Sequence, residues 1–477
     1  MFANSHIQQI EVMGTVNSFS QIKHLYSRAT FGISYTELQN KQSWNISRAV
    51  DQLLEDSNDY QNLQITAGPL YERKAASGMQ LTEEQKKDRL RQARQKVRLL
   101  NTSWLGLMAS SRAQLREKLT LFWHGHFACR STNAAFLQEL NNIHRKHALG
   151  NFKSMLLEVS KAPAMLQFLN NQQNRKGKPN ENFARELMEL FTIGRGNYSE
   201  TDVKEAARAF TGWGFNQRGQ FQFRPFLHDD DEKTFFGKSG NFDGTDIIDL
   251  LLAKPETADF VARKLYLFLV GDHVQESRVK ELGALFFKSD YNIAELVKKI
   301  LTADWFYAPA SMGNKIKSPV ELLVGINRQF NVKYDNPDVL LKFQGALGQI
   351  LFYPPNVAGW PGGKNWIDSS SLMVRLKIPS LILNAGIIDF DGKGDIEDEA
   401  IIALDRMKRT AVERQVKASA DWERFLAGLP RNISVADLAD FLLQRGMSPT
   451  LMKAMENNPS LKGVTIELLS LPEYQMC

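Results

Sequence analysis

Two histidines, His124 and His126, stand on either side of Gly125 in the aromatic segment FWHGHF. Imidazole nitrogens bind transition metals, but residues two apart on a continuous helix point about 200° away from each other. The glycine and the loss of apolar pattern after Phe127 predict that the helix ends here, where the two rings would converge on a divalent metal ion. The alternative is that both rings bond to backbone groups inside an aromatic cluster.

Two carboxylates, Glu186 and Glu189, lie three residues apart on one predicted helix face, close to Arg185. A pair of carboxylates beside a cation is what a general acid and base or a site for a hard metal uses. With His126 they form the candidate catalytic set. The alternative is an ordinary salt-bridged helix, since Arg185 and Glu189 are spaced to pair across one turn.

A second histidine-carboxylate pair, His228 and Asp229, lies in a region rich in glycine and phenylalanine. Together with His124 and His126 these two residues are the candidate metal ligands, and a solvated acidic loop is the alternative. Trp360 and Trp366 flank a glycine-rich turn. They would form the wall of a ligand pocket, or else anchor the loop on the helices.

Composition excludes several classes of protein. Only Cys129 and Cys477 occur, which excludes a disulfide framework and a cysteine-based zinc site. The sequence has no phosphate-binding GxxxxGK[ST], no GxSxG elbow and no HExxH. One helix is basic between residues 86 and 98, but acidic residues interrupt it and no aromatic residue is interleaved, which argues against nucleic acid as a partner.

Neither a signal peptide nor a membrane-spanning segment is predicted from the sequence. The first residues, MFANSHIQQIEVMG, lack the pattern of a signal peptide, and the most apolar window, Leu265 to Val270, is too short to span a bilayer. We therefore expect a soluble, cytoplasmic protein without a membrane span.

The elements that must position these residues are mostly helices. Residues 180–213 read as two amphipathic helices joined at Gly194, the second opening with a capping box at Ser199. Further helix starts occur at Thr82 and Ser318. We predict a mainly α, multi-helical globular body with irregular loops rich in glycine and aromatic residues and at most a small β-hairpin near Phe221.

The expected organisation has three parts. Residues 1–19 form an N-terminal segment, residues 20–376 a helical core domain, and residues 377–477 a C-terminal helical region.

Six sequence blocks resemble a bacterial family catalogued as domain of unknown function 1800. In chain order they are FWHGHF, ENFARELMEL, YSETDVKEAARAFTGW, LHDDDEK, IKSPVELL and PPNVAGWPGGKNW. They cover roughly residues 20–375. The resemblance implies an uncharacterised activity, and its members often carry export signals and are often encoded beside a sulfatase-like secreted family. An extracytoplasmic location is thus the alternative for this chain. Where many members read ELHTLG, this chain has Phe191 in place of the histidine.

Two functional hypotheses follow. The first is an enzyme with a histidine-carboxylate pocket in a helical body, dependent on a divalent metal and acting by hydrolysis or group transfer on a polar substrate. The second is a non-catalytic helical scaffold that binds a partner protein such as the sulfatase-like neighbour, with the same polar residues forming buried networks.

Overall fold

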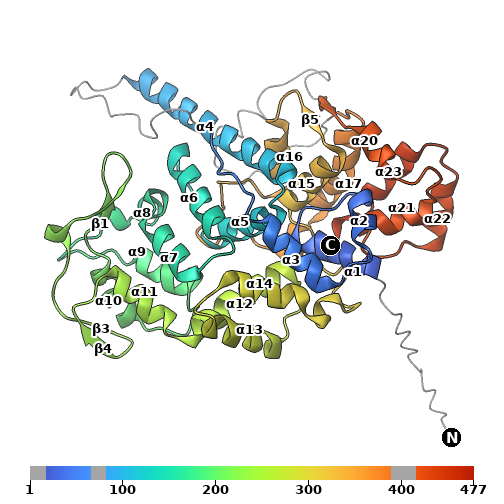
Figure 1. Ribbon diagram of the computed structural model, residues 1–477. Coiled ribbons are helices and arrows are strands. Elements are labelled where there is room, and N and C mark those ends of the chain that lie inside the picture. Colours follow the sequence, from blue (N-terminus) through green and yellow to red (C-terminus); the bar gives the residue numbers. More distant parts are fainter. Residues whose placement is uncertain (1–17, 66–81, 388–414) are drawn as a thin grey trace, which may run out of the picture.

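The computed structural model describes residues 18–65, 82–387 and 415–477, and the predicted N-terminal segment 1–19 falls almost wholly outside these ranges. The described chain is mainly α-helical, as predicted (Figure 1). The first helices are α1 (Ser18–Ala29), α2 (Tyr35–Lys41), α3 (Ile46–Asp56), α4 (Glu83–Ser110), α5 (Gln114–His126), α6 (Ala134–His147), α7 (Phe152–Lys161) and α8 (Pro163–Phe168).

The middle of the chain continues with short helices and then longer ones. These are α9 (Asn182–Glu186), a π-helical turn η2 (Leu187–Phe191), α10 (Glu200–Ala209), α11 (Gly244–Leu252), α12 (Pro255–Leu269), α13 (Glu276–Lys288), α14 (Ile293–Thr302), α15 (Pro319–Phe330), α16 (Val339–Leu347) and α17 (Ser369–Leu383). The C-terminal helices are α20 (Trp422–Ala427), α21 (Val435–Leu442), α22 (Pro449–Glu456) and α23 (Leu461–Leu469). Short 3₁₀ turns are η1 (Asn171–Gln173), η3 (Pro225–Leu227), η4 (Asp304–Tyr307), η5 (Gly363–Trp366) and η6 (Pro472–Gln475).

Strands occur only as short antiparallel pairs in the described residues. The pair near Phe221 is present, β1 (Trp213–Phe215) with β2 (Phe221–Phe223), and two more pairs accompany it. These are β3 (Lys233–Phe235) with β4 (Lys238–Gly240), and β5 (Lys333–Tyr334) with β6 (Ala418–Ser419). The β5–β6 pair joins segments far apart in the chain, which no local turn pattern predicts.

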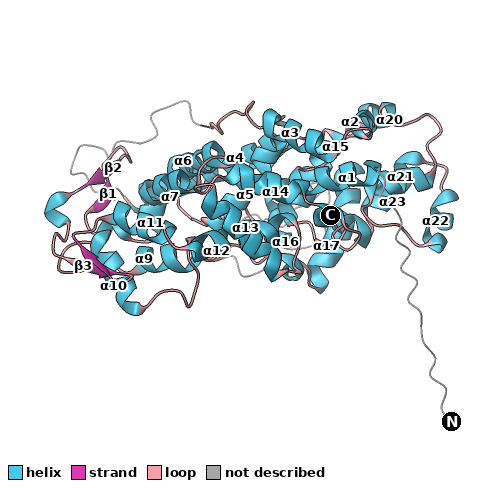
Figure 2. Cartoon of the chain, turned by 60° about the horizontal axis from the view of Figure 1, so that its bottom comes forward, coloured by secondary structure: helices cyan, strands magenta, loops and turns pink. Residues whose placement is uncertain are grey.

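The molecule is elongated. In both views the β1–β4 hairpins and α9 to α11 lie at one end, and α20 to α23 lie at the other, next to α1 and α2 (Figures 1 and 2). The predicted helix starts are confirmed: Thr82, Ser199 and Ser318 each begin a helix with a complete capping box. Gly194, at φ +79°, ends the first helical segment of residues 180–213 as expected.

Helix α5 lies at the centre and contacts α1, α3, α4 and α6. Every residue of α5 except Gly125 is buried. A helix buried on all sides would ordinarily be apolar throughout. This one instead carries Arg116, Glu117 and Lys118 in succession, and each of the three points to a different set of neighbours.

Glu117 is fully buried and accepts three hydrogen bonds. The Nε and Nη2 atoms of Arg145 on α6 donate to its two carboxylate oxygens at 2.6 and 3.1 Å, and the indole nitrogen of Trp104 on α4 donates at 2.9 Å. This bidentate pair ties α4, α5 and α6 together. A buried pair with all its polar atoms engaged is held strongly, because losing one partner leaves a buried charge unpaired.

Buried or half-buried cations satisfy the last carbonyl groups of neighbouring helices. The pattern covers Lys23 at the end of α21, Arg28 at the end of α12, Arg116 at the ends of α3 and α6, Lys118 at Thr30 after α1, and Arg328 at the end of α4. The last carbonyls of a helix lack intrahelical donors and carry partial negative charge, so a cation there is favourable.

We expect Glu117→Gln to lower the free energy of unfolding by about 3–5 kcal/mol, because it removes the charge that pairs with buried Arg145. The measurement is chemical denaturation with urea. Asp249→Asn is the matched control, since Asp249 pairs with Lys153 at 2.8 Å on the surface with both side chains about half exposed. That change should cost less than about 1 kcal/mol. Equal losses in the two variants would contradict the role given to Glu117.

Candidate functional site

The two histidines of FWHGHF do not converge. Helix α5 continues through Gly125 and ends at His126, so the predicted helix end lies at this cluster, but both histidines are still within the helix. Gly125 keeps a helical conformation because the chain after it, at Phe127, still donates to the Trp123 carbonyl. The two rings therefore leave the helix in different directions, as helical geometry requires.

His124 lies inside an aromatic cluster. Its Nε2 accepts a hydrogen bond of 3.1 Å from the backbone N–H of Phe352. Its ring lies 5.0 Å from the indole of Trp104 and 5.4 Å from that of Trp360, between ring centroids. Burial lowers the pKa of His124 to about 3, so the imidazole is neutral near pH 7.

His126 faces the π-helical turn. Its Nε2 donates to the carbonyl oxygen of Phe191 at 3.1 Å, and its Nδ1 is buried without a protein partner. Burial, reinforced by the charge of Lys264, lowers the pKa of His126 to about 3. Both histidines thus bond to backbone groups within an aromatic cluster, which is the arrangement of the alternative interpretation.

The tryptophan loop packs against the same glycine. A Cβ added to Gly359, which has φ +81°, would meet the carbonyl oxygen of Gly125 at 2.5 Å. The loop can approach α5 this closely only with glycine at that position. Trp360 contacts His124, whereas Trp366 is buried and its carbonyl accepts from Ser371. Neither tryptophan lines the two cavities described below, and their role as a ligand wall stays a prediction.

Arg185 and Glu189 do not form the ion pair that their spacing in the sequence predicts. Arg185 binds Glu181 at 3.0 Å and Glu200 at 2.7 Å, while Glu189 binds Arg195 and accepts from the Tyr198 hydroxyl at 3.1 Å. The π-helical turn breaks the regular spacing, so Arg185 and Glu189 do not pair.

Glu186 differs from its neighbours. It is half-buried at the last residue of α9, directly before the π-helical turn, and it has no hydrogen-bond or ion-pair partner among the described residues. Burial raises the pKa of Glu186, and the charge of Glu189 raises it further. A carboxyl group with a raised pKa is suited to proton transfer. The catalytic role of Glu186 therefore stays a proposal.

His228 and Asp229 hold their loop against the C-terminal end of α10. The Nδ1 of His228 donates to the Thr211 carbonyl at 2.9 Å, and Asp229 accepts from the Nε of Arg208 at 2.8 Å. Burial alone would raise the pKa of Asp229, but the hydrogen bonds from Arg208 and from the Asp231 backbone lower it below its ordinary value. Both side chains are thereby committed to holding the loop.

No three His, Cys, Asp or Glu side chains among the described residues are grouped so that they could share an ion. The structure brings His124, His126 and Trp360 to one region around α5, with Glu189 on the π-helical turn that His126 contacts. His228 and Asp229 instead bind Thr211 and Arg208, at the C-terminal end of α10. The divalent-metal site stays a prediction from the sequence.

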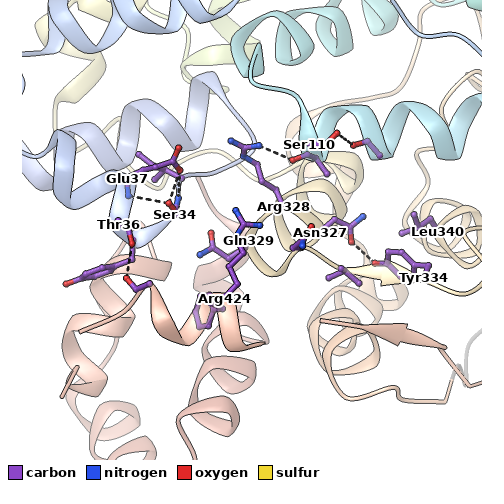
Figure 3. A pocket seen from close by; sticks show the side chains of 18 of the residues that line it. Ser34, Thr36, Glu37, Ser110, Asn327, Arg328, Gln329, Tyr334, Leu340 and Arg424 are labelled. Carbon is purple, nitrogen blue, oxygen red and sulfur yellow. Dashed lines mark hydrogen bonds between the residues drawn. The ribbon is translucent and has the colours of Figure 1, made fainter. Parts of the chain in front are cut away.

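A larger polar cavity lies elsewhere, between α2, α4, α15 and α20, and we call it the outer cavity. It has a volume of about 780 Å³ and is lined by residues within 33–37, 102–110, 327–340 and 424–429. Arg328, Gln329 and Arg424 stand in its middle, between the α2 residues around Glu37 and the side of Tyr334 (Figure 3). Several polar side chains face this open space, as is usual for a ligand site.

Two arginines, Arg328 and Arg424, line the outer cavity. Burial lowers the pKa of Arg328, nearby Glu37 partly opposes this shift, and Arg424 adds to it by repulsion. Arg328 donates to the Ala109 carbonyl at 2.9 Å, while Glu37 is engaged by the backbone N–H and hydroxyl of Ser34. The positive charge of the two arginines therefore exceeds what the single carboxylate on these walls balances.

A smaller cavity adjoins the outer one and shares Ile33 and Gln329 with it; we call it the inner cavity. Its volume is about 70 Å³, and it is lined by residues within 23–33, 317–329, 441–444 and 474–477 together with Lys118 of α5. The predicted site residues line neither cavity. Segments distant in sequence build both, so spacing could not reveal them.

Two local signals did point toward the cavities. The block IKSPVELL carries Lys317 and Glu321, and both line the inner cavity. The run Arg116-Glu117-Lys118 beside the apolar residues of the same helix marks buried charge, since charged residues are almost never fully buried without partners.

The sequence profile of a family described as "Protein of unknown function (DUF1800)" matches residues 24–476. The match continues well past Trp366, where the recognised blocks end. Comparisons with curated proteins and with solved structures gave no match. Among the described residues, no helix combines the length and the apolar character needed to cross a lipid bilayer.

We expect stability to fall as the pH falls from about 6.5 toward 3, because His124 and His126 resist protonation only in the folded state. With folded pKa values of about 3 against an ordinary 6.5, the unfolded chain binds more protons throughout this window. The two histidines together should remove about 4 kcal/mol of stability between pH 7 and pH 5. The measurement is urea denaturation at both pH values.

His124→Gln keeps an acceptor for the Phe352 N–H and should reduce that pH-dependent loss by about 2 kcal/mol. The matched control is His273→Gln at an exposed position, which should follow the unmodified protein. An unaltered pH dependence in His124→Gln would show that His124 is not held neutral by burial.

Proposed function

Since the chain belongs to the DUF1800 family of proteins of unknown function, we propose that it binds a polar organic anion of small-molecule size in the outer cavity. The observation that carries this proposal is the juxtaposition of Arg328 and Arg424, whose charges repel each other across one open space. An anion placed between them would remove that repulsion and bind through charge-assisted hydrogen bonds.

The dimensions and walls fit such a ligand. About 780 Å³ lies within the range of 300–1,000 Å³ typical of small-molecule sites. Hydroxyl and amide groups of Ser34, Thr36, Asn327 and Gln329 offer hydrogen bonds, and apolar side chains such as Leu340 and Phe425 cover the rest of the wall. The ligand is thus expected to carry hydroxyl groups beside its acidic group.

The walls of the outer cavity come from segments that are distant in the sequence, so a bound ligand would contact several of them at once. Its walls come from α2 and α4 near the start of the chain, α15 in the middle, and α20 near the end. A ligand that contacts Arg328 and Arg424 together would join these segments. Binding to the folded form alone stabilises a protein by about 2.7 kcal/mol at a ligand concentration of 100 times Kd.

The test is a thermal-shift screen with glucuronate, galacturonate and citrate, with glucose as the uncharged comparison. We expect at least one of the acids to raise Tm and glucose to have no effect. Exposed Arg424 is the residue to change, because Arg424→Gln should weaken binding roughly tenfold by removing one charge-assisted hydrogen bond. Arg431→Gln is the matched control at an exposed position outside the cavity.

Two outcomes would overturn this proposal. One is that none of the three acids changes Tm. The other is that Arg424→Gln and Arg431→Gln reduce the response equally, which would indicate a general effect of surface charge.

Proton transfer at Glu186 is a second candidate function, supported by its raised pKa, by the absence of a hydrogen-bond or ion-pair partner within residues 18–65, 82–387 and 415–477, and by its place beside a π-helical turn. We expect the pKa of Glu186 to lie above its ordinary value of 4.5 and Glu189→Gln to lower it, because that change removes a neighbouring negative charge. The measurement is ¹³C NMR of labelled glutamate carboxyl groups, assigned by comparison with Glu186→Gln. An unchanged midpoint in Glu189→Gln would rule out the coupling between the two carboxylates.

A further inference from the structure

We propose that the ligand of the outer cavity is a glycoside of a uronic acid, with its acidic unit at Arg328 and Arg424 and its neutral sugar units along α4, past Gly106, toward Tyr334. This inference rests on the proposed function, because it names the class of anion that the outer cavity binds and the direction in which that anion extends.

Charged side chains occupy only one part of the outer cavity. Among its described lining residues the charged ones are Glu37, Arg328 and Arg424. Figure 3 shows Glu37 on one side of the arginines and Tyr334 with Leu340 on the other. Glu37 would repel a second acidic group, and the described lining residues on the Tyr334 side include no cation to bind one. The walls therefore fit a ligand with a single negative charge, placed at the arginines.

Both arginines have donors left for a ligand. Arg328 uses its Nε and Nη1 atoms on the carbonyl oxygens of Gly32 and Ala109, and its Nη2 has no partner in the described part of the chain. The guanidinium group of exposed Arg424 has no hydrogen-bond or ion-pair partner there either. A carboxylate can accept charge-assisted hydrogen bonds from two such donors.

The Glu37 side of the cavity suits the hydroxyl groups of the same acidic unit. The backbone N–H and the hydroxyl of Ser34 both donate to Oε2 of Glu37, so its Oε1 can accept from a ligand. A single uronic acid nevertheless fills only part of about 780 Å³. The remaining space is lined by Tyr334, Pro337 and Leu340, so a ligand that fills the cavity continues in that direction.

The wall beside the remaining space is a face of α4 with small side chains. The α4 residues that line the cavity are Thr102, Gly106, Ala109 and Ser110. This wall leads from the arginines to α16, because the Ala109 carbonyl accepts from Arg328 at 2.9 Å. At the other end, Asn101 donates to Gln344 of α16 at 3.0 Å. A Cβ added to Gly106 would meet no atom within 4 Å, so Gly106 borders open space between the arginines and α16.

The α16 end of the cavity combines polar groups with apolar surface. The hydroxyl of Tyr334 binds the Asn327 amide group, and Thr102 contributes a second hydroxyl. Pro337 and Leu340 are apolar. A sugar ring has hydroxyl groups at its edge and C–H groups on its faces, and it matches both parts of such a wall. A hydrocarbon chain would leave the polar groups without partners.

The first experiment compares the Tm response to glucuronate with the response to glucuronosyl-xylobiose, a trisaccharide with one carboxylate. We expect the trisaccharide to bind roughly tenfold more tightly, because its xylose units add contacts along α4. Xylotriose, which lacks the carboxylate, should have no effect. Glucuronate binding without a gain for the trisaccharide would overturn this inference and leave the proposed function standing. The absence of a response to any acid would overturn both.

Gly106→Leu tests the direction in which the ligand extends. The variant should fold, because leucine favours a helix more than glycine does and its side chain enters open space. It should keep the response to glucuronate and reduce the affinity for the trisaccharide to that for glucuronate. Gln95→Leu, at an exposed position of α4 outside the cavity, is the matched control and should keep both responses.

Two results with Gly106→Leu would contradict the inference. A preference for the trisaccharide that persists in this variant would place the neutral units elsewhere. Loss of the glucuronate response as well, with the variant still folded, would place the acidic unit at Gly106 instead of the arginines.

Discussion

The structure depends on how three consecutive charged residues are buried in α5. Arg116, Glu117 and Lys118 lie at the centre of the molecule, where an unpaired charge costs several kcal/mol. Each must therefore find partners, and the partners come from different directions. Arg116 binds the ends of α3 and α6, Glu117 binds Arg145, and Lys118 binds Glu321 and the end of α1. These contacts fix the orientation of α1, α3, α6 and α15 around α5.

The same rule extends beyond α5. Helices that end inside a protein leave carbonyl groups without donors, and here cations from other helices supply the donors. Lys23, Arg28 and Arg328 do this at three further helix ends. A carbonyl oxygen satisfies the hydrogen-bonding need of a cation but carries only partial charge. Cations held in this way keep part of their charge uncompensated, and Arg328, one of them, also lines the outer cavity.

Local sequence signals determined the helices but not the sites. Ser199 and Ser318 could be identified as helix starts because a capping box lies within four residues. Arg424 and Arg328 lie almost a hundred residues apart, and no periodicity relates them. The predicted pairing of Arg185 with Glu189 was wrong for a local reason. A π-helical turn shifts the side chains after Glu186, whereas the spacing rules assume a regular helix.

Chemical residue type and functional availability are different properties. His124 and Asp229 have the chemistry of a metal ligand, yet His124 accepts a hydrogen bond from the backbone of Phe352 and Asp229 binds Arg208 of α10. Arg424 would not attract notice in the sequence, since arginine is common on surfaces. Its significance comes from its place with Arg328 on the wall of the outer cavity, which tertiary contacts create. A polar group whose partners are already complete stabilises the fold, whereas one left incomplete beside a cavity has binding energy available for a ligand.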